Sequence, residues 1–506
     1  MVRAERVLRK EGKAPKIKSD QENTFDSLKS SEKIPPPGST EETIAAIATP
    51  PGPGGIGIIR ISGPLALYIL QKLFLYRHKT SVPVYKSHRL YYGSIVAPGS
   101  SVPIDEVLAV FMRAPHTYTR EDVVEIQCHG SYLVLQEILS LILTHGARLA
   151  QPGEFTKRAF LNGRLDLTQA EAVLELIEAR TDEGRSVAMG QLQGKLHEKI
   201  SETQERLLAM RAIIEVAIDF PEDETDILDS DSLLQQLRTA VEEPLAVLIT
   251  RANEGKIFRE GISAVILGRP NVGKSSLLNT LLEEDRALVT PIPGTTRDTI
   301  EEFINIKGMP VRIVDTAGIR HTIETVEEMG IQRARAKLAD ADLVLFILDA
   351  TEPLTEEDKA LYSSIKQNSK KQKVLLVLNK IDIGSGTSAE TYRTGLGNEE
   401  LVEVSAKFHT GILELKDSVF TIFTGGIKGP GWDLGAAAVP NVRHKAAMEK
   451  ALKACRRAQK GLETNISPDL LAIDIQAALE HLGDIVGETT PEDVLDMIFE
   501  RFCIGK

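Results

Sequence analysis

The residues with the clearest chemistry in this sequence form a phosphate-binding loop. The fixed positions of a P-loop are matched in type and spacing by Gly268, Gly273, Lys274 and Ser275. In such a loop, backbone N–H groups surround the β-phosphate, the lysine reaches the β- and γ-phosphate oxygens, and the hydroxyl binds Mg²⁺. An apolar run at 264–267 precedes the loop and a helix-like stretch at 276–279 follows it. This strand–loop–helix context predicts binding of a nucleoside triphosphate, without indicating its base.

Two later segments indicate that the base is guanine. They follow strand-like runs, and they are Asn379-Lys380-Ile381-Asp382 and Ser405-Ala406-Lys407. The carboxylate of Asp382 can accept hydrogen bonds from both the N1–H and the exocyclic amine of guanine. Adenine has no donor at either position and would leave the carboxylate unpaired, at a considerable cost in free energy. The second segment is the usual further contact to guanine, so the sequence predicts a GTPase domain.

Two segments are expected to surround the γ-phosphate. Asp315 follows the strand-like run 311–314 and would hold the metal through water. The segment 290–298 is expected to be the first switch, in which Thr296 would join Ser275 as a ligand of Mg²⁺. The complete set of expected nucleotide contacts is Asn271, Val272, Gly273, Lys274, Ser275, Ser276, Thr290, Thr295, Thr296, Asp315, Thr316, Ala317, Gly318, Asn379, Lys380, Asp382, Ser405, Ala406 and Lys407.

The position that follows Asp315-Thr316-Ala317-Gly318 raises the question of how GTP is hydrolysed. It holds Ile319, whereas the best-known small GTPases have a glutamine there that orients the attacking water. The chain is therefore either a feeble GTPase, or another residue supplies the base while a bound cation supplies positive charge. The candidate bases are Glu324, Glu327 and Glu328, and the candidate catalytic cations are Arg297, Arg320 and a K⁺ held by the Asn271 carboxamide with the carbonyls of Thr290 and Ile292.

The composition restricts the class of protein. With 42% hydrophobic and 26% charged residues, the 506-residue chain resembles an ordinary soluble protein of three or four units. A net charge of −12 argues against broad independent binding of nucleic acid. The three cysteines, Cys128, Cys455 and Cys503, lack metal-ligand spacing and indicate reduced thiols in a cytoplasmic compartment. We expect the first two to be packing residues.

Changes in pattern along the chain predict five segments. Residues 1–40 are a polar tail, in which interspersed acidic residues count against a transit peptide. Residues 41–155 have a mixed α/β pattern, while 156–260 and 425–506 have a helical one. The GTPase motifs fall between these two helical parts, at 261–424. We therefore expect a multidomain α/β and all-α fold, in which a Ras-like P-loop G domain is inserted into a loop of one helical domain.

Within the first domain, short β-rich runs are expected at 56–61, 107–111 and 123–127, and a helix at 133–143.

With these motifs assembled, the chain resembles the MnmE (TrmE) family of tRNA modification GTPases from about Thr43 to Lys506. The segments that carry the resemblance are 48–63, 151–172, 268–279, 293–298, 315–320 and the terminal Phe-Cys-Ile-Gly-Lys at 502–506. The resemblance implies a GTP hydrolase that acts with an FAD-containing partner, MnmG, on C5 of the wobble uridine of tRNA. It also implies a homodimer, a folate one-carbon donor that binds the N-terminal domain, and K⁺-dependent hydrolysis when G domains meet.

The resemblance also implies roles for particular residues. By motif position, the K⁺ ligands are Asn271, Thr290, Ile292 and Thr295, the Mg²⁺ ligands are Ser275 and Thr296, and the acid that positions water is Glu327. The implied folate contacts are Arg60, Glu125, Arg164 and Lys506, whose charges suit a pterin and a glutamate tail. Cys503, in the terminal motif, is a candidate participant in the modification itself, although a lone cysteine beside apolar residues is more often structural.

Two alternatives come from other classes of protein. One is a GTPase of ribosome assembly without folate chemistry, which would carry a recognisable basic RNA-binding module. The other is a nucleotide-gated scaffold that binds folate only structurally.

Overall fold

The computed structural model describes residues 42–77, 84–220, 228–285, 302–314, 341–368, 372–384, 388–426 and 438–506. The chain divides into two units, Met1–Glu42 and Thr43–Lys506. All elements described below belong to the second unit. Among the described residues, no helix is both long and apolar enough to cross a membrane.

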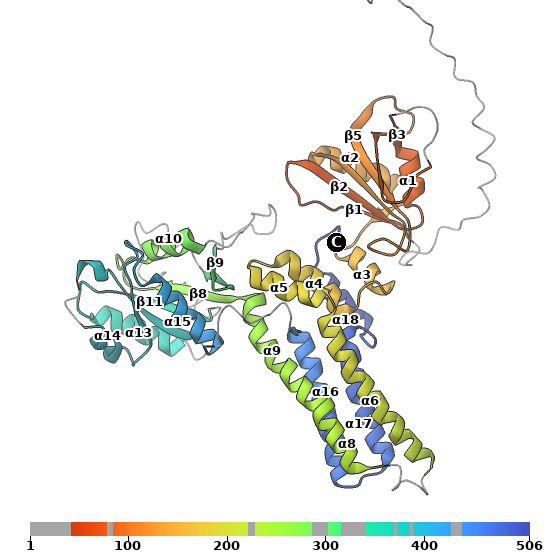
Figure 1. Cartoon of the computed structure of the whole chain (residues 1–506). Coiled ribbons are helices and arrows are strands. Elements are labelled where there is room, and N and C mark those ends of the chain that lie inside the picture. Colours follow the sequence, from red (N-terminus) through yellow and green to blue (C-terminus); the bar gives the residue numbers. More distant parts are fainter. Residues whose placement is uncertain are drawn as a thin grey trace, which may run out of the picture. The chain divides into compact units, whose positions relative to one another are not determined.

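A seven-stranded sheet in the order β3-β4-β5-β6-β2-β1-β7 forms the N-terminal part of this unit. Its strands are β1 (Ile44–Ile47), β2 (Gly54–Ser62), β3 (Phe74–Tyr76), β4 (Arg89–Val96), β5 (Pro103–Met112), β6 (Val123–Gly130) and β7 (Arg148–Leu149). Helices α1 (Ala66–Leu73) and α2 (Tyr132–Thr144) pack on one face through a shared apolar core (Figure 1). The expected strands and helix of this region are therefore present, each extended by a few residues.

The alternation of side chains along β6 explains how this sheet presents polar groups. Val124, Ile126 and Cys128 are buried in the core beneath α1 and α2. Because successive side chains of a strand point to opposite faces, Glu125 lies on the other face. There it is paired in register with Arg60 of β2. The sequence pattern that buries one face of the sheet thus places an acid and a base side by side on the other.

A bundle of helices is formed by two stretches of chain that are far apart in sequence. The first contains α3 (Glu154–Leu161), α4 (Leu167–Glu178), α5 (Asp182–Leu192), α6 (Lys195–Asp219), α8 (Ser230–Leu237), η3 (Arg238–Glu242) and α9 (Glu243–Glu260). The second contains α16 (Val442–Glu463), α17 (Pro468–Val486) and α18 (Glu492–Phe499). Buried residues of α6, α8 and α9 share one apolar core with those of α16 and α17. Helices α4 and α16 both begin at a capping box, formed by Asp166 and Asn441.

The remaining elements form a six-stranded sheet in the order β13-β12-β11-β8-β10-β9. Its strands are β8 (Ile262–Leu267), β9 (Glu302–Ile306), β10 (Met309–Val314), β11 (Leu343–Asp349), β12 (Lys373–Asn379) and β13 (Leu401–Glu403). Only β9 is antiparallel to its neighbour. Every residue of β11 is buried, as expected for a central parallel strand covered on both faces.

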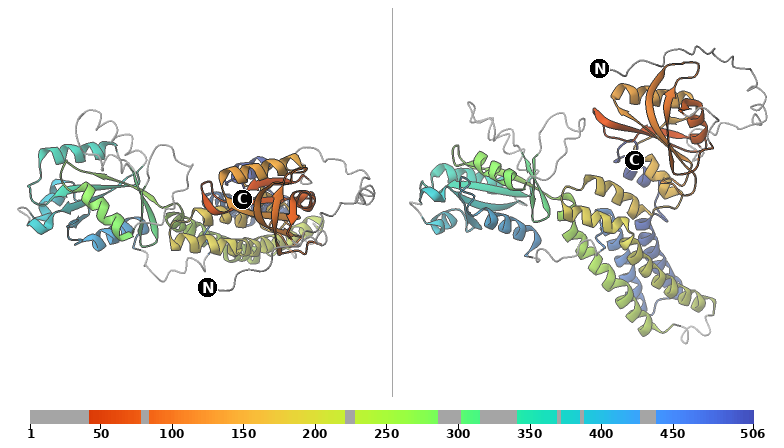
Figure 2. Two further views of the ribbon diagram at one scale, coloured as in Figure 1. Left: turned by 90° about the horizontal axis from the view of Figure 1, so that it is seen from above. Right: turned by 45° about the horizontal axis from the view of Figure 1, so that its top comes forward.

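Helices cover both faces of this second sheet. Apolar residues of α10 (Lys274–Asp285) and α15 (Ile412–Thr424) join the core on one face. Those of α13 (Glu356–Asn368) and α14 (Ala389–Gly395) join the core on the other (Figure 2). The combination of an N-terminal α/β domain, helices and a P-loop α/β domain confirms the predicted fold class.

Candidate functional site

The P-loop connects the carboxyl end of β8 to the first residue of α10, as the sequence predicts. Gly273 has a φ of 99°, and a Cβ at this position would lie 2.1 Å from Nδ2 of Asn379. Only glycine can occupy this position without displacing the neighbouring loop. Asn271 also has a positive φ, of 66°, a conformation that asparagine tolerates better than most residues. The backbone thus gives a reason for asparagine at 271 that the sequence reasoning missed.

Lys274 lies across the loop to which it belongs. Its Nζ donates to the carbonyl oxygens of Gly268, at 2.9 Å, and Arg269, at 2.6 Å. Burial lowers the pKa of the Lys274 ammonium. The ammonium is therefore held against the loop by two carbonyl oxygens, which phosphate oxygens could replace.

Asn379 connects the motifs that the sequence predicts to surround the nucleotide. Its Nδ2 donates to the carbonyl of Val272 at 2.9 Å, and its Oδ1 accepts from the backbone N–H of Ala406 at 3.1 Å. The residue is buried, so both hydrogen bonds are protected from water. The P-loop and the Ser405-Ala406-Lys407 segment are thereby held at fixed positions relative to the end of β12. The sequence motif identifies Asn379 as a contact, but it does not reveal this bridging role.

Asp382 is oriented by a neighbouring hydroxyl. Ser405 Oγ donates to Asp382 Oδ1 at 2.6 Å, and the N–H of Phe408 donates to the same Oγ at 3.3 Å. Thr280 of α10 anchors this segment through a 2.7 Å hydrogen bond to the carbonyl of Ala406. Since one carboxylate oxygen is occupied by Ser405, the group has a defined direction in which it can accept from a base.

Several predicted site residues lie outside the described residues. They are Thr290, Ile292, Thr295, Thr296, Arg297, Asp315, Thr316, Ala317, Gly318, Arg320 and Glu327. Within the described part, Ser275 and Ser276 occupy the first turn of α10, and Lys407 places its Nζ 5.2 Å from the centroid of the Phe408 ring. The described residues thus include the predicted phosphate and base contacts, which remain predictions, as do those of the two switch segments.

A second candidate site lies on the N-terminal sheet. Arg60 Nε donates to Glu125 Oε1 at 2.8 Å, and both side chains are 19% exposed. The Arg60 guanidinium lies 6.0 Å from the Tyr118 ring centroid and 5.7 Å from that of Phe155. Arg60 Nη1 also donates to the carbonyl oxygen of Gly505, at 3.3 Å. The site therefore combines an ion pair, two aromatic rings and the C-terminal segment of the chain.

The approach of the C-terminal segment depends on glycine. Gly505 has a φ of 96°, and a Cβ there would lie 2.5 Å from the carbonyl oxygen of Ile47 on β1. The N–H groups of Gly153 and Lys506 donate to the carbonyl of Cys503, at 3.5 and 3.3 Å. Three of the predicted folate contacts, on β2, β6 and the last residues, are thus brought together from positions far apart in sequence.

Arg164 and Cys503 complete the set of predicted residues near this site. Arg164 donates to the Tyr118 carbonyl at 3.0 Å, and its guanidinium lies 4.6 Å from the Tyr118 ring centroid. It therefore reaches Arg60 only through the shared tyrosine. Cys503 is exposed, whereas burial raises the pKa of Cys128 to about 11 and that of Cys455 to about 12. The two buried thiols lie in the apolar cores of the first sheet and of the helical bundle, which fits their expected role in packing.

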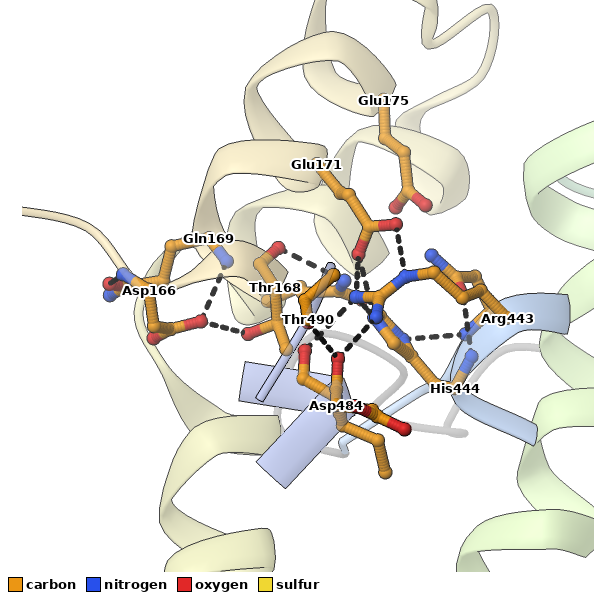
Figure 3. A network of polar contacts seen from close by, with 12 residues as sticks. Asp166, Thr168, Gln169, Glu171, Glu175, Arg443, His444, Asp484 and Thr490 are labelled. Atoms are coloured by element: carbon orange, nitrogen blue, oxygen red, sulfur yellow. Dashed lines mark hydrogen bonds and ion pairs between the residues drawn. The ribbon is translucent and has the colours of Figure 1, made fainter. Parts of the chain in front are cut away.

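A buried polar network, which the sequence does not predict, joins the two halves of the helical bundle (Figure 3). Glu171 of α4 accepts from Arg443 Nε at 2.9 Å and lies 2.7 Å from Nε2 of the buried His444, both on α16. Arg443 also donates to the carbonyl of Asp484, near the end of α17, at 2.6 Å. Although burial opposes ionisation, these partners lower the pKa of Glu171. The network connects segments that precede and follow the P-loop domain in sequence.

Glu175, one turn further along α4, has a different environment. Its Oε1 lies 3.1 Å from Nε of Arg259, yet its Oε2 is buried without a hydrogen-bond partner among the described residues. Burial outweighs the attraction of Arg259 and raises the pKa of Glu175 to about 7. Arg259 also donates to the carbonyl of Val439 at 2.7 Å. Arg259 lies at the end of α9, where the chain leaves the helical bundle for β8, and Val439 lies just before α16, where the chain returns to the bundle.

Comparison with known families identifies two matching regions. Residues 43–164 match the family described as the GTP-binding protein TrmE N-terminus. Residues 167–503 match the MnmE helical domain family. Together they leave only the first residues, the last ones and a two-residue junction outside.

Individual relatives give the same result. The chain is 50% identical, over 92% of its length and 98% of the relative's, to the tRNA modification GTPase MnmE of Desulfotalea psychrophila. It is 45% identical, over 92% of its length and 99% of the relative's, to that of Alkaliphilus oremlandii. Among solved structures, the G domain of the T. maritima iron transporter FeoB is 28% identical and covers 31% of this chain and 96% of its own, with a TM-score of 0.25.

Proposed function

Because the chain belongs to the MnmE family of tRNA modification GTPases, we propose that its GTP hydrolysis serves modification of the wobble uridine at C5, together with an FAD-containing partner of the MnmG type. The observation that supports the proposal most is the 50% identity, over 92% of the chain, to a tRNA modification GTPase. The arrangement of the predicted guanine-binding residues adds to it. Asn379 holds the P-loop and the segment after β13 together there, and Ser405 orients Asp382. The product we infer is carboxymethylaminomethyluridine when glycine is the amine donor.

In the nucleotide site, each described residue has a distinct task. Lys274 would exchange its loop carbonyls for the β- and γ-phosphate oxygens, and Asp382 would accept from the guanine edge. Ser275, in the first turn of α10, would ligate Mg²⁺ together with Thr296, and the ion would neutralise phosphate charge. The chemistry of these donors fits, because hard oxygen ligands suit Mg²⁺.

A potassium ion would supply the positive charge that other GTPases take from arginine. The carboxamide oxygen of Asn271 suits an alkali cation, and the left-handed backbone keeps the residue within the loop. Thr290, Ile292 and Thr295 would complete the set of ligands, and Glu327 would position the attacking water. Arg297 and Arg320 remain candidate sources of further positive charge.

The group of residues around Arg60 on the N-terminal sheet would suit a reduced folate that carries a one-carbon unit. Glu125 can accept from the amino and ring N–H groups of a pterin, while Arg60 can donate to its oxygen. The partly buried ring of Tyr118 beside Arg60 offers an apolar surface for a flat ligand, while the fully buried Phe155 ring packs beside the guanidinium. Arg164 and Lys506 would meet the carboxylates of the glutamate tail, and Cys503 stands on the same segment as Lys506.

A second copy of this chain would cover the open face of the N-terminal sheet. Leu90 and Tyr92 on β4 and Leu108 on β5 are 52%, 39% and 38% exposed. Tyr92 and Leu108 are paired in register, and Leu90 lies two residues from Tyr92 on the same face. Leu108 lies on β5, the strand next to β6, which carries Glu125, so a homodimer formed here would lie close to the proposed folate site.

The proposal is tested by measuring wobble uridines by mass spectrometry in a strain that lacks this chain. We expect the modified uridine to disappear and to return when the wild-type chain is supplied. Asp382→Asn, which removes the guanine acceptor, should fail to restore it, while Glu356→Gln, an exposed acid of α13 that contacts Lys359, should restore it fully. An unchanged uridine profile in the deletion strain would refute the proposed function.

A further inference from the structure

Lys380, the lysine of the Asn-Lys-Ile-Asp segment, has an acidic partner outside every motif recognised in the sequence. Its Nζ donates to Oδ2 of Asp349, the last residue of β11, at 2.6 Å. Lys380 itself has a left-handed backbone, with a φ of 67°, at the end of the neighbouring strand β12. The side chain of Asp349 is 7% exposed and that of Lys380 is 31% exposed. The carboxylate of the pair is therefore buried, while the lysine side chain is partly exposed.

The carboxylate of Asp349 is fixed by further contacts. Its Oδ1 accepts from the backbone N–H of Thr351 at 3.0 Å and from the Thr351 hydroxyl at 2.7 Å. Asp349 is in register with Asn379, and the N–H of Ala350 donates to the carbonyl of Asn379 at 2.9 Å. One carboxylate oxygen is thus committed to the turn after β11, and the other to Lys380.

The ionisation of this acid is favoured by the same contacts. Burial alone would raise the pKa of Asp349, but the hydrogen bonds from Lys380 and Thr351 outweigh it and lower the pKa. The carboxylate is consequently charged throughout the neutral range. A charged acceptor on a rigid central strand holds an ammonium more strongly than a neutral one would.

We propose that Asp349 is a positioning residue for the guanine nucleotide, which acts by holding the Lys380 side chain beside the base site. Asp382, two residues after Lys380, would read the edge of the base. With its ammonium anchored on Asp349, the aliphatic stem of Lys380 is available to pack against the flat face of the same purine. Without that anchor, the flexible lysine would lose rotamer freedom on each binding event, which weakens affinity.

The inference rests on the proposed guanine site and extends it in one respect. Asp382 should decide which purine is accepted, because it contacts the groups that distinguish guanine. Asp349 should instead strengthen binding of the nucleotide through Lys380, without contacting the base. Asp349 should strengthen the binding of GDP and GTP alike. It should leave the rate of GTP hydrolysis unchanged once the site is saturated with GTP.

The test uses the full-length protein and measures affinity for fluorescent GDP together with steady-state GTP hydrolysis. For Asp349→Asn we expect a roughly tenfold weaker affinity for GDP and a raised KM for GTP, with kcat within about twofold of the wild type. Glu356→Gln removes an acidic charge at an exposed position of the adjacent α13 and should change neither quantity. An unchanged or tighter affinity in Asp349→Asn would overturn the inference.

A double-mutant cycle separates positioning from a merely structural effect. If Asp349 acts through Lys380, then Asp349→Asn should weaken GDP binding no further when Lys380→Met is already present. Additive losses would overturn the inference, because Asp349 would then act on the fold of the turn at Thr351. If Lys380→Met itself leaves the affinity unchanged, the guanine site as proposed is wrong, which is a separate failure.

Discussion

Single residues of the proposed guanine site make contacts within the protein that fix the site's other members in place. Asn379 bridges two loops, Ser405 fixes Asp382, and Asp349 fixes Lys380. All of these partners belong to the chain itself. Preorganisation of this kind lowers the entropy that is lost on binding, so it contributes to affinity without touching the nucleotide.

Glu175 provides a residue-scale prediction about pH. Its pKa in the folded protein, about 7, is raised above the ordinary value of 4.5, so folding favours the protonated acid. Its contribution to stability is therefore full at low pH and is lost as the pH rises from about 4.5 through 7. Relative to Glu175→Gln, which does not titrate, the wild type should lose up to about 3 kcal/mol over this range.

Urea unfolding of the two proteins between pH 5 and pH 8 measures this difference. Glu171, Glu178 and Glu260 oppose ionisation of Glu175, and Arg259 favours it. We expect the free energy of unfolding of the wild type to fall relative to that of Glu175→Gln as the pH rises. A difference between the two proteins that stays constant, or a wild type that gains relative stability, would contradict the assignment of Glu175 as the titrating group.

At the scale of elements, the spacing of apolar residues predicts which segments become helices and strands. Apolar residues recur every second position in a strand and every three or four positions in a helix. The strand β6 and the helix α2 contain the segments expected at 123–127 and 133–143. The P-loop also lies where it is expected, between β8 and α10. Local preference and tertiary burial agree in these segments, which is why the sequence alone suffices there.

The P-loop gives an element-scale prediction about potassium. Asn271→Gly keeps a residue that tolerates the φ of 66° but removes the carboxamide, whereas Asn271→Ala removes both. If the carboxamide binds K⁺, both variants should lose the stimulation of GTP hydrolysis by K⁺ over Na⁺. Only the alanine variant should also lose about 1 kcal/mol of stability through backbone strain.

Stopped-flow hydrolysis in the two salts, paired with thermal unfolding of the nucleotide-free proteins, measures both effects. Equal rates for the wild type in K⁺ and Na⁺ would remove the potassium mechanism. If Asn271→Gly keeps the full stimulation of GTP hydrolysis by K⁺ over Na⁺, then the ion is bound by ligands other than the Asn271 carboxamide.

At the scale of the whole described unit, residues distant in sequence meet at two places. Glu171, Arg443 and Asp484 join segments that lie on both sides of the P-loop domain in the chain. The C-terminal residues meet the N-terminal sheet at Arg60 and Gly505. The apolar contacts of Phe499 and Phe502 with α4 anchor the helix that leads to this segment.

The second of these places predicts the effect of shortening the chain. Removal of residues 503–506 deletes Gly505 and Lys506 but leaves the buried Phe502 in place. We expect binding of 5-formyl-tetrahydrofolate to weaken at least tenfold, as it should in Arg60→Ala. Both changes remove a positively charged side chain and a contact between Arg60 and Gly505 from the proposed folate site. Binding of GDP should stay unchanged.

Isothermal titration of both ligands checks this prediction. Arg185→Ala, which removes an exposed arginine that contacts Asp182, is the matched control and should bind folate normally. Full folate affinity in the shortened chain would exclude the C-terminal residues from the pocket.

The fold class and the GTPase activity were predictable from the amino-acid sequence, because they depend on short motifs and on regular local patterns. The same motifs predict the P-loop and the segments that would recognise guanine. Three contacts could be found in the folded chain alone: Asn379 bridges two loops, Asp349 holds Lys380, and Gly505 lies against β1. These contacts join residues 27 to more than 400 positions apart, as with Asn379 and Ala406 or Arg60 and Gly505. No local pattern encodes such a pairing, since it arises from the order of strands in a sheet and from the packing of helices.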